Sequence, residues 1–534
     1  MLRRIVALGL ILLAACGAPA SVTPAVSPPP SRAALPTMAP AGATVLASDY
    51  GKTPPRAPTT PSLAAPSPTA PAAPTPSATD WSAALRPQFR AELNKIKDLT
   101  RYEMQWDLSA DLSELRGEQR IFFTNRTGKD LDEIYLRLFA NATPGEGGIT
   151  LHQVLVDERQ ADIELSQKDT VARLTLDETL APEHSLVITL DYTVEIPKDA
   201  TGRYSDFTQT AWLTTLPTIY PLIPAYDENG WHLENPPEYG DVVYADSSIY
   251  DVTINTPSDY QVIASGELVQ EIPQDKRIAR RFIAAPMRDF NANLTNVLEK
   301  ASAQVDDVTV TSWHKPEDAA AGQRALDWAV NALRVYEKRF GAYPFRSLDV
   351  VESPTTAGGI EYPGVITVSS NLYQDPGQTS FFEFATAHEV AHQWFYSIIG
   401  NDQVNHPWQD EALAQYATTI YFEDRYGAAT ARQIRDDYFQ QQYVTGEQKY
   451  GDLPAGLPVE AYAEDAYSAF VYSKGPLFFQ AVRDQIGDDA FFRALQAYVQ
   501  RFKFDIATPL DLINVFQQTS GRDITPLYLK WIGN

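Results

Sequence analysis

Cysteine is almost absent from this sequence. Cys16 is the only one among 534 residues, so no intramolecular disulfide can form and the fold has to depend on packing. Basic residues are also scarce, since 43 Lys and Arg stand against 68 Asp and Glu, for a formal net charge of -25. This charge argues against nucleic acid and against an anionic membrane face as partners. Histidine is rare as well, with seven in the chain.

Long hydrophobic runs are missing beyond the amino terminus, so no second membrane anchor is expected. Residues 1–16 begin with Met-Leu-Arg-Arg, continue with an apolar run and end in Leu-Ala-Ala-Cys, as is typical of a secretory signal peptide. That ending resembles the lipobox of bacterial lipoproteins, in which the Cys becomes the lipidated first residue of the mature chain. The resemblance implies an extracytoplasmic protein that a lipid on Cys16 anchors to the membrane. An ordinary signal peptide with an incidental Cys is the alternative.

Residues 17–79 consist mostly of Pro, Ala, Ser and Thr, with hardly any large apolar side chain. Such a segment cannot bury enough apolar surface to offset the entropy cost of ordering. We therefore predict a disordered linker that holds the rest of the chain at a distance from the membrane.

Residues 80–305 have the pattern of an antiparallel β domain. Short segments rich in β-branched and aromatic residues alternate with turns that contain Gly, Asn, Asp and Pro. Residues 220–227 are interrupted by Pro and are expected to shape a groove rather than to form a strand.

Residues 306–534 change to a helical period. Apolar residues recur at near-helical spacing over residues 318–340, and two short apolar segments at 348–351 and 365–368 indicate strands. Two further helices are expected, one over residues 379–399 and one from just after Pro407 to just before Gly427. The predicted fold class is α+β with several domains, in which an antiparallel β domain precedes a mostly helical domain with a small sheet.

The strongest motif is His388-Glu389-Val390-Ala391-His392, which Glu411 follows after eighteen further residues. Two histidines four residues apart lie on one face of a helix, so both imidazoles can point at one metal ion. Glu389 lies about 100° round the helix from His388, close enough to reach the attacking water without being a ligand. Glu411 adds a third ligand. Three protein ligands with one open position are typical of a catalytic zinc site, so the sequence predicts one zinc ion.

The other histidines have no such arrangement. His406 precedes Pro407 in the predicted connecting loop and is interpreted as a structural or surface histidine. The remaining four lie in the β region without ligand-like spacing: His152, His184, His232 and His314.

Four separated motifs resemble the zinc aminopeptidase family of aminopeptidase N and leukotriene hydrolase. The zinc pattern with Glu411 has the family's spacing, and Trp-Gln-Asp-Glu-Ala at residues 408–412 resembles its Trp-x-Asn-Glu-Gly motif. Gly-Gly-Ile-Glu-Tyr at residues 358–362 resembles its Gly-x-Met-Glu-Asn exopeptidase motif, and residues 471–475 resemble its Tyr-x-Lys-Gly segment. The resemblance covers the chain from about residue 100 onward and implies a thermolysin-like zinc peptidase domain over residues 306–534.

The resemblance also implies roles for individual residues. Glu389 would act as general base, and Tyr472 would stabilise the oxyanion, with Tyr467 as the runner-up. Glu361 would pair with the free amino terminus of a peptide substrate, and Gly358 and Gly359 would let the substrate backbone approach closely. Asp410 would either orient a ligand histidine or serve in the first turn of its helix.

The exopeptidase motif is also where this sequence departs from the family, because Ile360 replaces Met and Tyr362 replaces Asn. The expected activity is a zinc aminopeptidase that acts on peptides outside the cytoplasm. A zinc endopeptidase, a hydrolase of non-peptide substrates and a catalytically silent peptide-binding surface lipoprotein are the alternatives.

Overall fold

The computed structural model describes residues 79–533 apart from 144, 146 and 236–238. The predicted signal peptide, Cys16 and almost all of the predicted linker lie outside these residues. Those parts of the sequence analysis therefore stay predictions.

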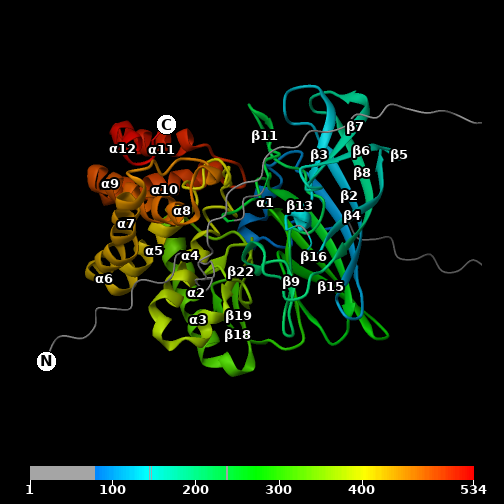
Figure 1. Ribbon diagram of the computed structural model, residues 1–534, viewed down its shortest axis with the longest axis horizontal. Coiled ribbons are helices and arrows are strands. Elements are labelled where there is room, and N and C mark those ends of the chain that lie inside the picture. Colours follow the sequence, from blue (N-terminus) through cyan, green and yellow to red (C-terminus); the bar gives the residue numbers. More distant parts are fainter. Residues whose placement is uncertain (1–78, 144, 146, 236–238, 534) are drawn as a thin grey trace, which may run out of the picture. The chain divides into compact units, whose positions relative to one another are not determined.

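An eight-stranded sheet organises the first part of the described chain, with strand order β15-β16-β13-β1-β2-β8-β4-β5 (Figure 1). All neighbouring pairs in it are antiparallel except β1 and β13, which run parallel. Alternate residues of β1 and β2 are buried, as a sheet with one covered face requires. The strands are β1 (Arg101–Leu108), β2 (Glu114–Thr124), β4 (Gly148–Val156), β5 (Arg159–Gln160), β8 (Ser185–Glu195), β13 (Ser248–Pro257), β15 (Glu267–Gln274) and β16 (Arg277–Met287).

Aromatic side chains fill the core beside this sheet. Trp106 donates a hydrogen bond from Nε1 to the hydroxyl of Tyr192 at 2.9 Å, and both side chains are buried. A Cβ at Gly117 would lie 2.2 Å from the Tyr192 ring, so only glycine fits at that point of β2.

Three smaller sheets complete the β region. Their strands are β3 (Leu131–Arg137), β6 (Asp162–Ser166) and β7 (Val171–Leu180), then β9 (Thr208–Gln209), β10 (Thr214–Pro217), β14 (Gln261–Ala264) and β17 (Asn291–Thr295), and finally β11 (Tyr226–Asp227) and β12 (Gly230–Trp231). Residues 220–227, expected to shape a groove, mostly pack into the core instead. Tyr220 and Leu222 are buried, and the Tyr220 hydroxyl accepts a hydrogen bond from the backbone of Phe290.

A five-stranded sheet of order β18-β19-β20-β22-β21 follows, and β21 forms one of its edges. Strands β19, β20 and β22 run parallel, as expected where helices cover a sheet. The described chain from Asp80 onward forms one compact unit, so the domain boundary at residue 305 stays a prediction. The strands are β18 (Glu299–Val305), β19 (Val308–His314), β20 (Ser347–Ser353), β21 (Gly359–Ile360) and β22 (Val365–Ser369).

Helices dominate the remainder, and three of them test the sequence analysis directly. The helix predicted over residues 318–340 is confirmed as α2 (Ala319–Phe340). The helix predicted over residues 379–399 ends much earlier, as α4 (Thr379–Ala391), with His392 as its C-cap. Farther along, Tyr396 adopts a φ of 145°, which is incompatible with a helix that continues to residue 399. The next helix begins at Glu411 rather than just after Pro407, as α5 (Glu411–Tyr426), with Asp410 as its N-cap.

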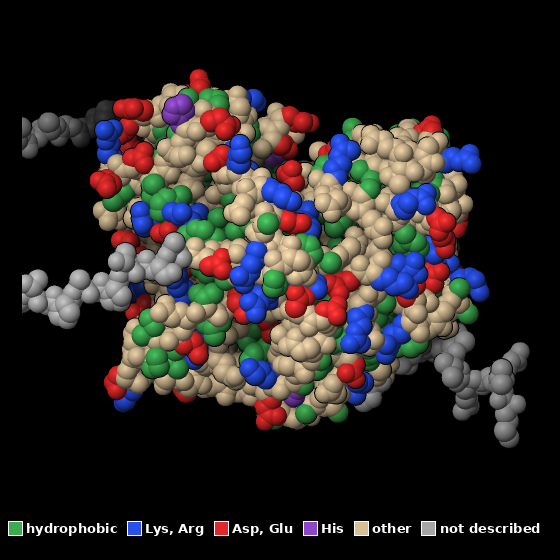
Figure 2. All heavy atoms as spheres, turned by 180° about the vertical axis from the view of Figure 1, so that it is seen from behind, with side chains coloured by type: hydrophobic (Ala, Val, Ile, Leu, Met, Phe, Trp, Pro, Cys, Tyr) green, Lys and Arg blue, Asp and Glu red, His purple; other side chains and the backbone are tan. Residues whose placement is uncertain are grey.

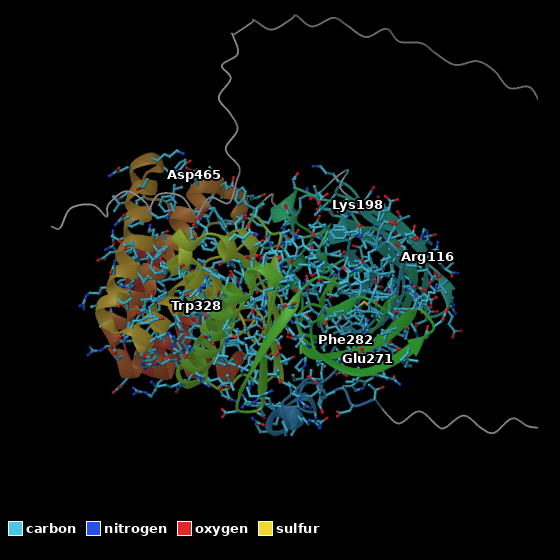
Figure 3. All side chains as sticks on the ribbon, turned by 90° about the horizontal axis from the view of Figure 1, so that it is seen from below. Arg116, Lys198, Glu271, Phe282, Trp328 and Asp465 are labelled. Carbon is cyan, nitrogen blue, oxygen red and sulfur yellow. The ribbon has the colours of Figure 1, made fainter. Side chains whose placement is uncertain are left out.

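The other helices pack around α4 and α5 or lie at the start of the described chain (Figure 1). They are α1 (Arg90–Leu93), α3 (Ser370–Gln374), α6 (Ala428–Ile434), α7 (Gln441–Tyr450), α8 (Glu464–Ala469), α9 (Gly475–Ile486), α10 (Asp488–Phe502), α11 (Pro509–Ser520) and α12 (Thr525–Trp531). Figure 3 places Trp328, a residue of α2, in the helical part of the molecule and Phe282 in the β region, and both side chains are buried. Across the described residues, we find no helix with the length and apolar character that a membrane span needs.

Arg288 connects the β region to the helical region that follows it. Its guanidinium is fully buried and donates hydrogen bonds to the backbone oxygens of Ala245, Tyr396 and Asp505 at 2.9 to 3.1 Å. At the surface, acidic and basic side chains are interspersed over the face seen in Figure 2.

Candidate active site

The two motif histidines and Glu411 converge on one point. His388 and His392 lie on the last turn of α4 and its C-cap, and Glu411 is the first residue of α5. The Nε2 atoms of the two histidines are 3.0 Å apart, and each lies 3.3 Å from Glu411 Oε2. All three side chains are buried. The sequence prediction that these residues come together is therefore confirmed.

These residues fit a zinc ion. The Nδ1 of His392 lies 2.9 Å from the carbonyl oxygen of Phe395, which can only accept, so Nδ1 carries the proton and Nε2 keeps its lone pair. Glu411 Oε2 is buried without a hydrogen-bond partner. Ligands about 2.0 Å from a tetrahedral zinc lie about 3.3 Å from one another, close to the separations seen here.

The charges of this cluster also favour a cation. Burial disfavours ionised Glu411, but His392 and His388 outweigh it and hold the pKa of that carboxyl well below its usual range. Burial lowers the pKa of His388, which keeps this imidazole neutral and able to bind a metal.

Glu389 lies beside the cluster on α4 and packs against β21. A Cβ at Gly359 would lie 2.5 Å from Glu389 Cγ and Oε1, so the glycine is needed for this contact. This gives Gly359 a role that the sequence did not suggest, whereas a Cβ at Gly358 would meet only ordinary contacts. Burial, together with the charge of Glu361, raises the pKa of Glu389 well above its usual range. The carboxylate is thus a strong proton acceptor.

Glu361 directly follows the edge strand β21 and is buried. Its Oε1 accepts a hydrogen bond of 3.4 Å from Gln403 Nε2, which also donates to Asp410 Oδ2 at 2.8 Å. Asp410 in turn accepts from the backbone nitrogen of Glu411 through Oδ1. Asp410 is thus a helix cap, the second of the two roles that the sequence left open.

The two candidate tyrosines differ in their contacts. Tyr472 lies on the π-helical turn η8 (Phe470–Lys474), and its hydroxyl donates to Glu411 Oε1. Tyr467 lies one turn earlier, with its ring centre 5.5 Å from that of Tyr472 and its hydroxyl buried without a partner. Tyr472 is therefore in direct contact with the predicted metal ligands.

Asp241 is a further member of the site that sequence reasoning missed. One carboxylate oxygen of Asp241, of Glu361 and of Glu411 lie within 4.8 Å of one another. Burial and the charges of Glu361 and Glu411 raise the pKa of Asp241 well above its usual range. No motif surrounds Asp241 in the sequence, so no local signal identifies it.

A cleft of about 180 Å³ joins these groups. Among its lining residues are His388, Glu389 and Glu411, together with Asp241, Gly358, Gly359, Glu361, Tyr467 and Tyr472. His406 takes no part in the candidate metal clusters of the described residues.

Comparisons with known proteins agree with this geometry. Residues 324–531 match the Peptidase family M1 domain. Aminopeptidase N of Streptomyces lividans is 26% identical over 222 residues, which are 39% of this chain and 25% of that protein. Endoplasmic reticulum aminopeptidase 2 of Homo sapiens is 27% identical over 219 residues, 38% of this chain and 22% of that protein. The chain thus spans about a quarter of the length of these curated relatives.

Solved structures extend the likeness to most of the chain. An M1 zinc metallopeptidase from Deinococcus radiodurans superposes with a TM-score of 0.59 at 19% identity, covering 82% of this chain and 93% of that one. A mutant of that enzyme, bound to a Tyr-Ser-Ala substrate, gives a TM-score of 0.60 at 18% identity, covering 82% of this chain and 94% of that one. The predicted fold class is thereby confirmed. The chain therefore has the two-domain fold of M1 zinc metallopeptidases, and its residues 324–531 match the Peptidase family M1 domain.

Proposed function

We propose that this protein is a zinc-dependent aminopeptidase that removes amino-terminal residues from peptides. The observation that carries the proposal is the single cleft in which a metal-binding His-His-Glu cluster stands beside two further carboxylates, Glu361 and Asp241. The His-His-Glu cluster fits metal-assisted hydrolysis, and the carboxylates of Glu361 and Asp241 fit recognition of a free α-ammonium.

A zinc ion held by His388, His392 and Glu411 would supply a Lewis acid that polarises the scissile carbonyl and makes water acidic enough to be deprotonated near neutral pH. Glu389 accepts the proton of the attacking water and returns it to the leaving amine. The Tyr472 hydroxyl donates a hydrogen bond to the oxygen that becomes negative. Its contact with Glu411 holds the phenol beside the metal ligands, and its one O–H turns from Glu411 to that oxygen during the reaction.

Glu361 and Asp241 bind the α-ammonium of the substrate. Both carboxylates lie near Glu411, so a cation between them relieves the repulsion among three acidic groups, of which Glu361 and Glu411 are buried. The backbone of β21 at the sheet edge is available for strand-like pairing with the substrate. A substrate bound in this way presents its first peptide bond to the metal cluster.

Hydrolysis of amino-acid amides tests the exopeptidase assignment. We expect zinc-loaded protein to cleave leucine 4-nitroanilide and to leave its N-acetyl derivative intact, because acetylation removes the positive charge. Equal cleavage of both compounds, or of internal bonds in N-acetylated peptides, would replace the aminopeptidase with an endopeptidase. Cleavage of neither would contradict peptide hydrolysis and leave a hydrolase of other substrates or a peptide-binding protein.

Glu389→Gln tests the proton-transfer step. The change keeps the shape of the side chain and removes the base, so we expect kcat to fall roughly 100-fold to 10,000-fold. Zinc content, measured by mass spectrometry, should stay at one ion per chain, since Glu389 is not a ligand. An unchanged kcat with full zinc content would rule out this mechanism.

We also propose that the enzyme works outside the cytoplasm and is attached to the membrane through a lipid on Cys16. The basic start, the apolar run and the Leu-Ala-Ala-Cys ending support this proposal. A Cys16→Ser variant should move from the membrane fraction to the soluble fraction, or stay unprocessed. A Cys16→Ser variant that is processed normally and still remains in the membrane fraction would contradict a lipid anchor at this residue.

A further inference from the structure

A second recess lies beside the active-site cleft, on the β-domain side of Glu361. Its volume is about 80 Å³. A buried water needs only about 10 to 15 Å³ of such space, so the recess has room for an extended side chain. The recess and the cleft share the lining residues Tyr204, Gly240, Asp241, Ile360 and Glu361. A substrate whose ammonium is held by Glu361 and Asp241 therefore lies at the mouth of this recess.

Three side chains that line the recess leave a polar atom without a hydrogen bond. Asp289 Oδ1, Gln403 Oε1 and Thr218 Oγ1 are all without a partner, and the three residues are at most 2% exposed. Two of these atoms can only accept, and the threonine hydroxyl can accept as well as donate. Leaving such groups buried and unpaired is costly. The recess is thus arranged for a ligand that donates several hydrogen bonds.

The acidic residues of the recess favour a ligand that donates hydrogen bonds and also carries a positive charge. Asp206, Asp241, Asp289 and Glu361 line it, against a single lining cation, Arg203, whose guanidinium donates to the Gly240 carbonyl. Arg288, which neighbours Asp289 in the sequence, directs its guanidinium at three backbone oxygens instead. The other oxygen of Asp289, Oδ2, accepts from the Tyr396 hydroxyl. The recess therefore has an excess of acidic groups, and a bound cation would favour their ionised form.

The two positions at which the exopeptidase motif departs from the family pattern also belong to this recess. Ile360 and Tyr362 both line it, on either side of Glu361. The Tyr362 hydroxyl lies 3.5 Å from Asp206 Oδ2. Tyr362 thus faces the space beyond the ammonium site, and Ile360 lies between that space and the cleft.

We propose that this recess receives the side chain of the first substrate residue and selects a cationic one, arginine above all, through Asp289, Gln403 and Thr218. The guanidinium carries five N–H donors in a planar fork, which suits several acceptors spread over one wall. Lysine offers the same charge with fewer donors and follows arginine. This assignment rests on the aminopeptidase function proposed above and names its substrate class.

The kinetic test compares arginine, citrulline and leucine amides of the same fluorogenic amine. Citrulline keeps the length and most donors of arginine but has no charge. We expect kcat/KM for the arginine amide to exceed that for the citrulline amide by roughly tenfold or more, the effect of one buried charge pair. Asp289→Asn should remove most of this ratio, and the ratio cancels any effect of the substitution that is common to both amides.

Glu299→Gln is the matched control, because it removes one exposed carboxylate from β18, at the opposite edge of the five-stranded sheet from β21. It should leave the arginine-to-citrulline ratio unchanged. If Asp289→Asn does not fold, as judged by circular dichroism and thermal melting, the half-exposed Asp206→Asn should lower the ratio in its place. Arginine and citrulline amides cleaved equally well by the natural protein would overturn the inference and leave the aminopeptidase intact.

Calorimetry separates failure of this inference from failure of the proposed function. If no amide is cleaved, the aminopeptidase is wrong, but L-arginine should still bind the zinc-loaded protein more tightly than L-citrulline. That preference should disappear in Asp289→Asn. Equal binding of the two amino acids, or a preference that survives the substitution, would rule out a cationic recess.

Discussion

The metal cluster and the neighbouring recess both bury carboxylates, yet their charges are balanced differently. Glu411 is buried against two imidazoles, and these hold its pKa well below the usual range in spite of burial. Asp289 is buried against a tyrosine hydroxyl and the charge of Glu361, and burial raises its pKa to about 7. A buried carboxylate beside cationic or metal-binding partners stays ionised, and one without them takes up a proton until a cation arrives.

Removing the metal should have the largest effect on activity. It takes the bound cation out of the His-His-Glu cluster, which then resembles the recess in having buried carboxylates without a cation. We expect 1,10-phenanthroline to abolish amide hydrolysis and zinc to restore it. The melting temperature should fall as well. A bound ion stabilises the folded state by about 4 kcal/mol when its free concentration is about a thousand times its dissociation constant. Full activity in protein shown by mass spectrometry to lack zinc would contradict the assignment.

Glu361→Gln should have the next largest effect, because it leaves the α-ammonium with only one of the two proposed carboxylate partners. Loss of one partner in a buried charge pair costs about 2 kcal/mol or more, so kcat/KM for amides with a free amino group should fall roughly 30-fold. The zinc content should not change. A loss of the same size in Glu299→Gln would show that net charge, rather than this contact, is responsible.

The pH dependence of substrate preference should be the smallest effect. It tests most directly the contrast between Glu411, which stays ionised, and Asp289, whose pKa is raised. Above about pH 7 Asp289 is ionised and attracts a cation, and below it the carboxyl is neutral. The arginine-to-citrulline ratio of kcat/KM should therefore rise several-fold between about pH 6 and 8, as expected for one group titrating near 7. Taking the ratio cancels pH effects common to both substrates.

The groups that face Asp289 determine whether this profile can be assigned to it. The nearby charged or titratable groups are Arg288, Tyr396, Glu361, Tyr220, Tyr250 and Tyr362, of which Tyr396 donates a hydrogen bond to the carboxylate. Asp289→Asn should flatten the profile of the ratio. A profile that persists in this variant would assign the titration to another group, Glu361 in particular.

Those parts of the site that depend on helical spacing could be predicted from the sequence. His388 and His392 are four residues apart, and helix geometry alone brings their imidazoles together. Glu411 was predicted as the third ligand from its place after the motif, whereas Glu361 and Tyr472 required the resemblance to a family, because they come from separate elements. In the fold, the α2 helix followed its apolar period closely.

The residues that sequence reasoning missed are single polar side chains in loops or just after strands. Asp241, Asp289 and Gln403 reach the site only through contacts between distant segments, and nothing in the spacing of the chain marks them. The end of α4 was missed for a related reason, since the segment from Gln393 to Ile399 is apolar enough to continue a helix. In the structure the segment leaves the helix, Tyr396 has a positive φ, and its hydroxyl donates a hydrogen bond to Asp289.

Arg288 has a consequence for how this enzyme can be divided. Its three backbone acceptors belong to the β region, to the loop after the metal-binding histidines and to the segment before α11. A chain shortened to residues 306–534 would lose this guanidinium together with Asp241 and Asp289. Such a fragment would keep the three proposed metal ligands but lack part of the ammonium site and the acidic wall of the recess. Under the proposed function, the β region therefore supplies part of the substrate-binding site, and the helical region alone would not form it.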